Sequence, residues 1–204
     1  MSAVPKKLYT AEEYEARERV AEFKSEFYRG EIFPMEGPVG DFGLTFHHSR
    51  IKANLVVEIG ARIKGTRFQT LSSTMRIKVA ATGLQTYPDV LILCGLPRFA
   101  DRDEYCLSNP SVIIEVLSEP TAGRDLGVKF RSYREIESLA EIVFVESDQL
   151  ICTRYVRASD RRTWIYTCAE GFDGSLMIVT VDVTIPLRDI YAGVEFSEPA
   201  GPGE

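Results

Sequence analysis

The sequence lacks any long uninterrupted run of apolar residues. No stretch approaches the roughly 18 consecutive apolar residues that a membrane-spanning helix needs. Residues 1–18 become charged at the position where a secretory signal would become apolar. These two features predict a protein that stays in the cytoplasm.

The cysteine and histidine motifs of common metal sites are also missing. The chain has four cysteines and two histidines, and the cysteines are widely spaced with no Cys-x-x-Cys pair. Because zinc sites are built from such pairs or from histidine clusters, we expect free thiols, which are typical of a reducing compartment. Cys152 and Cys168 lie in apolar strand-like runs, which predicts that both are small core residues.

An excess of positive charge is absent as well. The chain carries 24 lysines and arginines against 30 acidic residues, a formal net charge of −6. This balance argues against a general nucleic-acid coat protein, because neutralisation of phosphates is the main source of non-specific affinity. It does not exclude a nuclease, since acidic residues around a metal add to the total and bound Mg²⁺ would reverse the local sign.

The remaining composition is that of an ordinary globular protein. With 204 residues, 45% hydrophobic and 26% charged, the chain is long enough for one sizeable core and short for two. We expect a single domain over residues 1–194. Residues 195–204 are rich in proline, glycine and glutamate, which predicts a flexible C-terminal tail.

Three segments carry helical patterns. Thr10 followed by Glu13 forms a capping box, which predicts a charged amphipathic helix over residues 11–27. Over residues 45–64, aliphatic residues recur at every fourth position and predict a second helix with one buried face. A third helix is predicted from about residue 126 to residue 135.

Strand-like runs make up most of the remaining sequence. Residues 90–93 and 112–114 are continuously apolar, which is typical of central strands buried on both faces. Further runs predict the other strands, at residues 31–36, 76–79, 142–145, 151–156, 164–168 and 176–179. The order of these elements favours a mixed α/β fold in which helices flank a central mixed β-sheet.

Two acidic residues lie beside the most apolar of these strands. Asp89 follows Pro88 and precedes the run 90–93, and Glu115 follows the run 112–114. A buried carboxylate is costly unless it is paired, hydrogen-bonded or coordinated to a metal. Carboxylates on neighbouring strands offer the hard oxygen ligands that Mg²⁺ prefers and leave positions open for water and substrate. The pattern therefore indicates a divalent-metal site at Asp89 and Glu115.

A lysine on the next predicted helix completes this candidate site. Hydrolysis of a phosphodiester also needs positive charge near the phosphoryl oxygens. Lys129 lies on the helix that follows Glu115, and Tyr133 occupies the same helical face one turn later. Lys129 is therefore the candidate for this role.

Several short motifs, each weak alone, follow one another along nearly the whole chain. They are residues 9–14 and 24–32, His48 with Ile51, Asn54 and Leu55, and residues 75–77, 87–90, 114–118, 125–130 with Tyr133, and 141–145. In this order and spacing the chain resembles the Uma-type restriction endonucleases, a family within the PD-(D/E)XK nuclease superfamily.

The resemblance implies a restriction-endonuclease-like core and a Mg²⁺- or Mn²⁺-dependent endonuclease that acts on DNA as a homodimer. It implies Asp89 and Glu115 as metal ligands and Glu26, on the first predicted helix, as a further acidic catalytic residue. The chain departs from the Glu-x-Lys pattern of the wider superfamily, because Leu117 stands two residues after Glu115. In this family a lysine on the following helix takes that place, and Lys129 matches it.

Each candidate residue also has a purely structural alternative. These are a turn residue for Asp89, a partner of Arg76 for Glu115, a solvated ion pair with Asp125 for Lys129, and an exposed helix face for Glu26. His48 is interpreted as a helix-start or cleft-lining residue outside the catalytic set. Two other functions stay open: a catalytically inactive nuclease-fold module that binds nucleic acid or protein, and a hydrolase that uses two carboxylates as glycosidases do.

Overall fold

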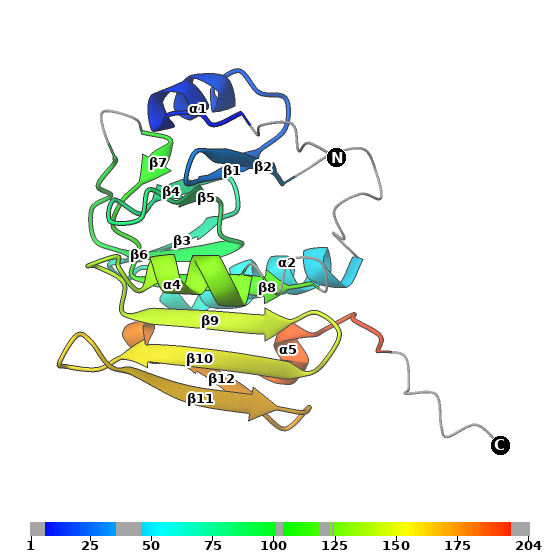
Figure 1. The fold of residues 1–204 in the computed structure, drawn as a ribbon. Coiled ribbons are helices and arrows are strands. Elements are labelled where there is room, and N and C mark those ends of the chain that lie inside the picture. The colour runs from blue at the N-terminus through cyan, green and yellow to red at the C-terminus, as the bar shows by residue number, and fades with distance from the viewer. Residues whose placement is uncertain (1–6, 36–45, 101–103, 119–122, 124, 197–204) are drawn as a thin grey trace.

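The computed structural model of the chain describes residues 7–35, 46–100, 104–118, 123 and 125–196 (Figure 1). Within these ranges no helix is both long enough and apolar enough to cross a membrane. The strands form a six-stranded sheet, a five-stranded sheet and a two-stranded sheet, with helices packed against them.

The six-stranded sheet forms the centre of the fold. Its strand order is β11-β10-β9-β8-β6-β3, with β8 and β9 parallel and all other neighbours antiparallel. The strands are β3 (Phe68–Ser72), β6 (Val90–Cys94), β8 (Val112–Leu117), β9 (Glu141–Glu146), β10 (Ile151–Arg157) and β11 (Trp164–Glu170). The predicted α/β class with a central mixed sheet is thereby confirmed.

Both faces of this sheet are covered, because its central strands are apolar on both sides. Val90 and Ile92 of β6 belong to the cluster that includes helix α2 (Phe46–Ile63), whereas Leu91 and Leu93 belong to the cluster on the other face. The first face also holds β12 (Ser175–Ile178), the 3₁₀ turn η2 (Val179–Val181), β13 (Val183–Pro186) and α5 (Leu187–Ile190). Helix α2 and this C-terminal hairpin together bury that side of the sheet.

A short helix lies on the opposite face, in front of β8 and β9 in Figure 1. It begins as a π-helical segment, η1 (Asp125–Lys129), and continues as α4 (Phe130–Tyr133). The buried Tyr133 packs there with Ile113 and Phe144 of the sheet. This packing holds η1 close to the middle of β8.

The five-stranded sheet lies above the central one in Figure 1, with α1 (Ala11–Glu18) against it. Its order is β2 (Glu31–Pro34), β1 (Ser25–Tyr28), β5 (Gln85–Thr86), β4 (Arg76–Lys78) and β7 (Cys106–Leu107). Tyr14 of α1 stacks on Phe27 of β1 with ring centroids 5.0 Å apart, and its hydroxyl donates a hydrogen bond to the Ser25 carbonyl. Helix α1 therefore covers one face of the five-stranded sheet, and the other face is turned toward the central sheet (Figure 1).

The first predicted helix is the main error in secondary structure. Its capping box is present, but the helix ends at Glu18, and residues 25–28 form strand β1. Val20 and Phe23, two apolar residues within the predicted helix, are 85% and 51% exposed. Pairing of β1 with both β2 and β5, together with the Tyr14 stack, overrides the local helical preference.

The other predictions differ from the structure mainly at the ends of elements. Helix α2 occupies most of the predicted residues 45–64, and the helix predicted at residues 126–135 is the shorter η1–α4 unit. All four thiols are free, as expected. Of the two cysteines predicted to be core residues, Cys152 is buried, but Cys168 is exposed on the edge strand β11, so its predicted burial is wrong. Most of the predicted tail lies outside the described residues, although Phe196 packs against Tyr191.

Candidate active site

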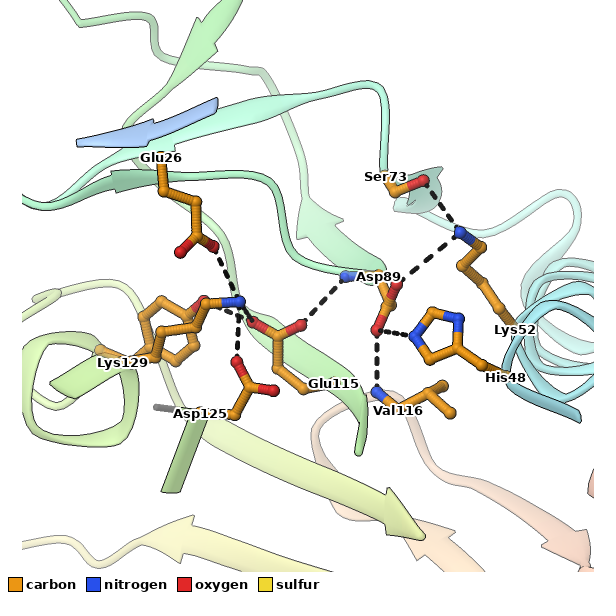
Figure 2. Close-up of polar contacts among 10 residues, drawn as sticks. Glu26, His48, Lys52, Ser73, Asp89, Glu115, Val116, Asp125 and Lys129 are labelled. Carbon is orange, nitrogen blue, oxygen red and sulfur yellow. Dashed lines mark hydrogen bonds and ion pairs between the residues drawn. The ribbon is translucent and has the colours of Figure 1, made fainter. Parts of the chain in front are cut away.

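Asp89 and Glu115 lie side by side because of the register of two antiparallel strands. Val90 of β6 pairs with Ile114 of β8, so Asp89 stands opposite Glu115. The backbone amide of Asp89 donates to Glu115 Oε2 at 3.3 Å, and the amide of Val116 donates to Asp89 Oδ2 at 2.9 Å (Figure 2). Each carboxyl group thus accepts a hydrogen bond from the backbone beside the other, which places the two groups next to each other at this end of β6.

Two side chains from helix α2 hold the Asp89 carboxylate. His48 Nε2 lies 3.2 Å from Asp89 Oδ2, and Lys52 Nζ lies 3.7 Å from Oδ1 and also donates to Ser73 (Figure 2). Burial acts to raise the pKa of Asp89, but the contacts with His48, the Val116 amide and Lys52 outweigh it and hold the pKa below its usual value. Asp89 is therefore ionised at neutral pH.

For the Glu115 carboxyl, the effect of burial on the pKa outweighs that of the favourable contacts. Glu115 is 2% exposed, accepts a hydrogen bond of 2.5 Å from the Tyr133 hydroxyl at Oε1, and has Lys129 Nζ 3.4 Å from the same oxygen. Burial raises its pKa to about 8, against the lowering effect of Lys129 and with the repulsion of Asp125 and Asp89 added. Glu115 thus binds a proton at neutral pH unless another cation takes its place.

Lys129 is a buried ammonium at the centre of an acidic cluster. Its Nζ lies 2.8 Å from Asp125 Oδ1, 2.9 Å from Glu26 Oε1 and 3.4 Å from Glu115 Oε1. Burial acts to lower its pKa, but these carboxylates raise it well above the usual value, so the charge is retained. Thr86 donates a further hydrogen bond to Glu26.

Comparison with known proteins places the chain in a family. The sequence profile of the Uma2 family, described as "Putative restriction endonuclease", matches residues 11–178. The chain belongs to the Uma2 family. The family resemblance inferred from the sequence is thereby confirmed.

Relatives of this Uma2 protein include two proteins of Synechocystis sp.. One uncharacterized protein of Synechocystis sp. is 37% identical over 166 residues, covering 81% of this chain and 89% of the relative. A second from the same organism is 26% identical over 185 residues, covering 91% and 92%. The crystal structure of a "putative nuclease belonging to DUF820" from Anabaena variabilis shares the fold at 16% identity, with a TM-score of 0.68 and 90% and 97% coverage.

The residues of the Uma2 site fit a divalent cation. Four carboxyl groups lie here, those of Glu26, Asp89, Glu115 and Asp125, against the two ammonium groups of Lys52 and Lys129. The described residues contain no group of three or more histidine, cysteine or acidic side chains placed to hold a metal alone. Mg²⁺ is commonly held by one or two carboxylates, with water and phosphate as the other ligands. Asp89 and Glu115 match that donor set, and the excess of negative charge matches a cation.

The structural alternatives for the predicted residues do not agree with this geometry. Glu26 is 4% exposed on strand β1 instead of on an exposed helix face. Lys129 does pair with Asp125, but at 6% exposure it is not a solvated surface residue. Among the described residues, the positive partner of Glu115 is Lys129 and not an arginine. The structure thus brings all four predicted site residues together.

Sequence reasoning missed three residues of this site. His48 was assigned to the helix start or cleft, whereas it contacts Asp89 directly at 5% exposure. Lys52 lies four residues after His48 on the same face of α2, and Asp125 lies four residues before Lys129. The spacing of four residues shows that each of these pairs shares one helical face. It does not show which residues elsewhere in the chain that face contacts.

Proposed function

We propose that this Uma2 protein is a divalent-metal-dependent endonuclease that hydrolyses phosphodiester bonds in DNA. The proposal depends on one observation, the meeting of the Asp89 and Glu115 carboxyl groups beside the buried ammonium of Lys129. The family description as a restriction endonuclease supports DNA as the substrate. Cutting both strands of a duplex favours a homodimer, which sedimentation analysis of the purified protein tests.

Asp89 and Glu115 would hold Mg²⁺ or Mn²⁺, which would supply an activated water and neutralise phosphate charge. Asp89 is already ionised and is oriented by His48 and the Val116 amide. Lys129 keeps a positive charge beside Glu115 for the charge that develops on the phosphoryl oxygens. Glu26 fixes the position of that ammonium from strand β1.

Plasmid cleavage tests this function. Supercoiled plasmid incubated with the protein and Mn²⁺ is expected to become nicked or linear, and EDTA is expected to stop the reaction. Asp89→Ala and Glu115→Ala should abolish cleavage while keeping the folded circular-dichroism spectrum. Asp173→Ala, which removes an exposed carboxylate elsewhere, is the matched control and should cut like wild type. Cleavage that persists in EDTA or in both site variants would refute the assignment.

An inactive nuclease-fold module is the second candidate. The observation in its favour is that Lys129 and Tyr133 already satisfy Glu115 Oε1, so this oxygen does not need a metal ion. Titration calorimetry with Mn²⁺ separates the two candidates. Nucleic-acid binding with no Mn²⁺ binding heat would favour the module, whereas Mn²⁺ binding that Asp89→Ala removes favours the enzyme.

A further inference from the structure

Two neighbouring pockets beside α4 are lined mainly by arginines. The first, of about 490 Å³, lies between α4 and the turns that join β1 to β2 and β4 to β5. The second, of about 440 Å³, lies between the end of α4 and the β10–β11 hairpin. Both pockets share Arg134 and Glu135, so they form one continuous surface, which we call the arginine tract. Its charged residues are two glutamates, Glu135 and Glu137, and six arginines, Arg29, Arg131, Arg134, Arg157, Arg161 and Arg162.

The charges of these arginines are not neutralised by ion pairs. Within the described residues, none of the six pairs with a carboxylate, in contrast to Arg62 with Glu58. Their printed contacts are with backbone carbonyls and aromatic rings: Arg131 donates to the Gly127 carbonyl, Arg161 to the Glu137 carbonyl, and Arg29 and Arg134 lie over the rings of Tyr28 and Phe130. Six of the 24 lysines and arginines of an acidic chain are thus gathered on one surface, where they outnumber the glutamates.

Arg157 is the half-buried member of the tract. Its guanidinium lies 4.6 Å from the ring centroid of Trp164 and donates to two backbone carbonyls at the end of α4. Burial and the neighbouring charge of Arg161 hold the pKa of Arg157 below its usual value, against the opposite effect of Glu135. A cation that its surroundings destabilise gains from an added anion, so this pocket is suited to a negatively charged ligand.

The turn between β10 and β11 carries two consecutive arginines. Asp160 accepts hydrogen bonds from the amides of Arg162 and Thr163 and from the Thr163 hydroxyl, so its carboxylate is held by the turn itself. Arg161 has a left-handed backbone with φ 59°, a conformation that favours glycine or asparagine. Arg161 and Arg162 are both exposed, so their guanidinium groups stay open to solvent in the second pocket.

The tract lies on the same face of the central sheet as Lys129. On β1, Tyr28 lines the first pocket and Glu26 pairs with Lys129. Side chains two residues apart in a strand share a face, whereas Phe27 between them stacks on helix α1. In the second pocket, Trp164 packs against the buried cluster on the α4 face of the central sheet. A ligand that spans both pockets therefore lies over α4, the helix that continues from Lys129.

We propose that the arginine tract binds the phosphodiester backbone of a nucleic acid, with a separate phosphate at each of the two pockets. Guanidinium groups match phosphate oxygens with forked hydrogen bonds, and the lining contains arginines and no lysine. Contacts with the backbone position a strand without reading its sequence. This binding goes beyond the proposed cleavage, because it needs no metal and does not depend on whether the bound strand is cut.

Fluorescence anisotropy of a fluorescein-labelled DNA duplex, titrated with the protein in EDTA at increasing salt, tests the tract. Arg131→Gln and Arg162→Gln each remove one exposed arginine, the first from one pocket and the second from the other. Each should flatten the slope of log Kd against log salt by about 0.9, and the double variant should flatten it by about 1.8. At about 0.1 M salt, each single variant should raise Kd on the order of 10-fold.

Lys64→Gln and Arg67→Gln are the matched controls. Both residues are exposed cations just after α2, which packs on the opposite face of the central sheet, and Arg67 lies over the ring of Phe68 as the tract arginines lie over rings. These variants should keep the wild-type slope. Thermal unfolding of all variants checks that the fold is intact.

A fluorescein-labelled polyglutamate peptide distinguishes a nucleic acid from an acidic protein segment. The peptide should bind much more weakly than the duplex, because forked recognition of phosphate adds to simple charge attraction. Equally tight binding of the peptide, weakened by the same two tract variants, would overturn the assignment to nucleic acid.

The outcomes separate the tract from the nuclease proposal. Plasmid cleavage by wild type together with wild-type slopes in both tract variants would overturn the tract and leave the nuclease intact. A slope that flattens in only one tract variant, or equally in tract and control variants, would also overturn it. Slopes that flatten in both tract variants alone support the tract, even if no plasmid is cut and the nuclease proposal falls.

Discussion

The raised pKa of Glu115 makes the stability of the metal-free protein depend on pH. The pKa of this carboxyl is about 8 in the folded chain, against a usual value of 4.5. Between these values the folded state binds the proton more tightly than the unfolded state, so the free energy of unfolding falls as pH rises. The largest slope is about 1.4 kcal/mol per pH unit, and between pH 5.5 and 7.5 the loss approaches about 2–3 kcal/mol.

Glu115→Gln removes the titrating group and keeps the shape of the side chain. The amide has one acceptor oxygen where the carboxyl has two, so it loses either the bond from the Asp89 amide or the contacts with Tyr133 and Lys129, at a cost that does not change with pH. The informative quantity is therefore the pH slope. Urea unfolding in EDTA from pH 5.5 to 8.5 should give a steeper decline for wild type than for Glu115→Gln.

Divalent metal provides the second half of this test. Adding Mg²⁺ at pH 8 should stabilise wild type more than Glu115→Gln, because bound cation replaces the proton on the carboxylate. Asp173→Asn, at an exposed position, should follow wild type in both series. If wild type and Glu115→Gln show the same pH slope, the carboxyl does not titrate in this range and the reasoning from its burial is wrong.

Three further variants probe the same cluster. Lys129→Met leaves the carboxyl groups of the cluster without their ammonium partner and should lower the free energy of unfolding in urea at pH 8 by about 3–5 kcal/mol. Lys64→Met is the control at an exposed position. An equally small effect of both variants would contradict the argument from burial. Tyr133→Phe removes the hydroxyl donor to Glu115 and should cost about 1–3 kcal/mol in thermal unfolding, so an unchanged Tm would show that the hydrogen bond is dispensable. His48→Ala should weaken Mn²⁺ binding about 10-fold or more in calorimetry, and wild-type affinity would mean that His48 does not orient Asp89.

Much of the fold was predictable because its central strands are apolar on both faces. The runs that became β6 and β8 have no polar face, a pattern that few other environments explain. Helix α2 was predictable for a similar reason, since its buried Ile51, Leu55, Ile59 and Ile63 recur at every fourth position.

Short strands were not predictable in the same way. Strands β5 and β7 contain two residues each; β5 pairs with the distant β1 as well as with the neighbouring β4, and β7 pairs with the distant β4. The residues before and within strand β1 carry a helical pattern, because Val20, Phe23 and Phe27 follow one another at spacings of three and four. Only the three-dimensional contact between Tyr14 and Phe27 shows that these two residues belong to different elements.

The candidate site was also predictable only in part. The local sequence singles out its residues, but the packing of distant elements brings them together. Asp89 and Glu115 stood out because each adjoins an apolar strand, but their contact depends on the register of β6 against β8. A shift of one residue in that register would turn one carboxyl to the opposite face of the sheet. The partners His48 and Glu26 come from a helix and a separate sheet, so their arrival at this point follows from the packing of whole elements.

The acidic net charge of the chain is compatible with a polyanionic substrate because the charge is unevenly placed. Four of the 30 acidic residues are gathered inside the site, where Lys52, Lys129 and, in our proposal, a divalent cation neutralise them. The field that a substrate meets at the site is therefore set by these local charges and the cation, and the formal charge of −6 does not measure it.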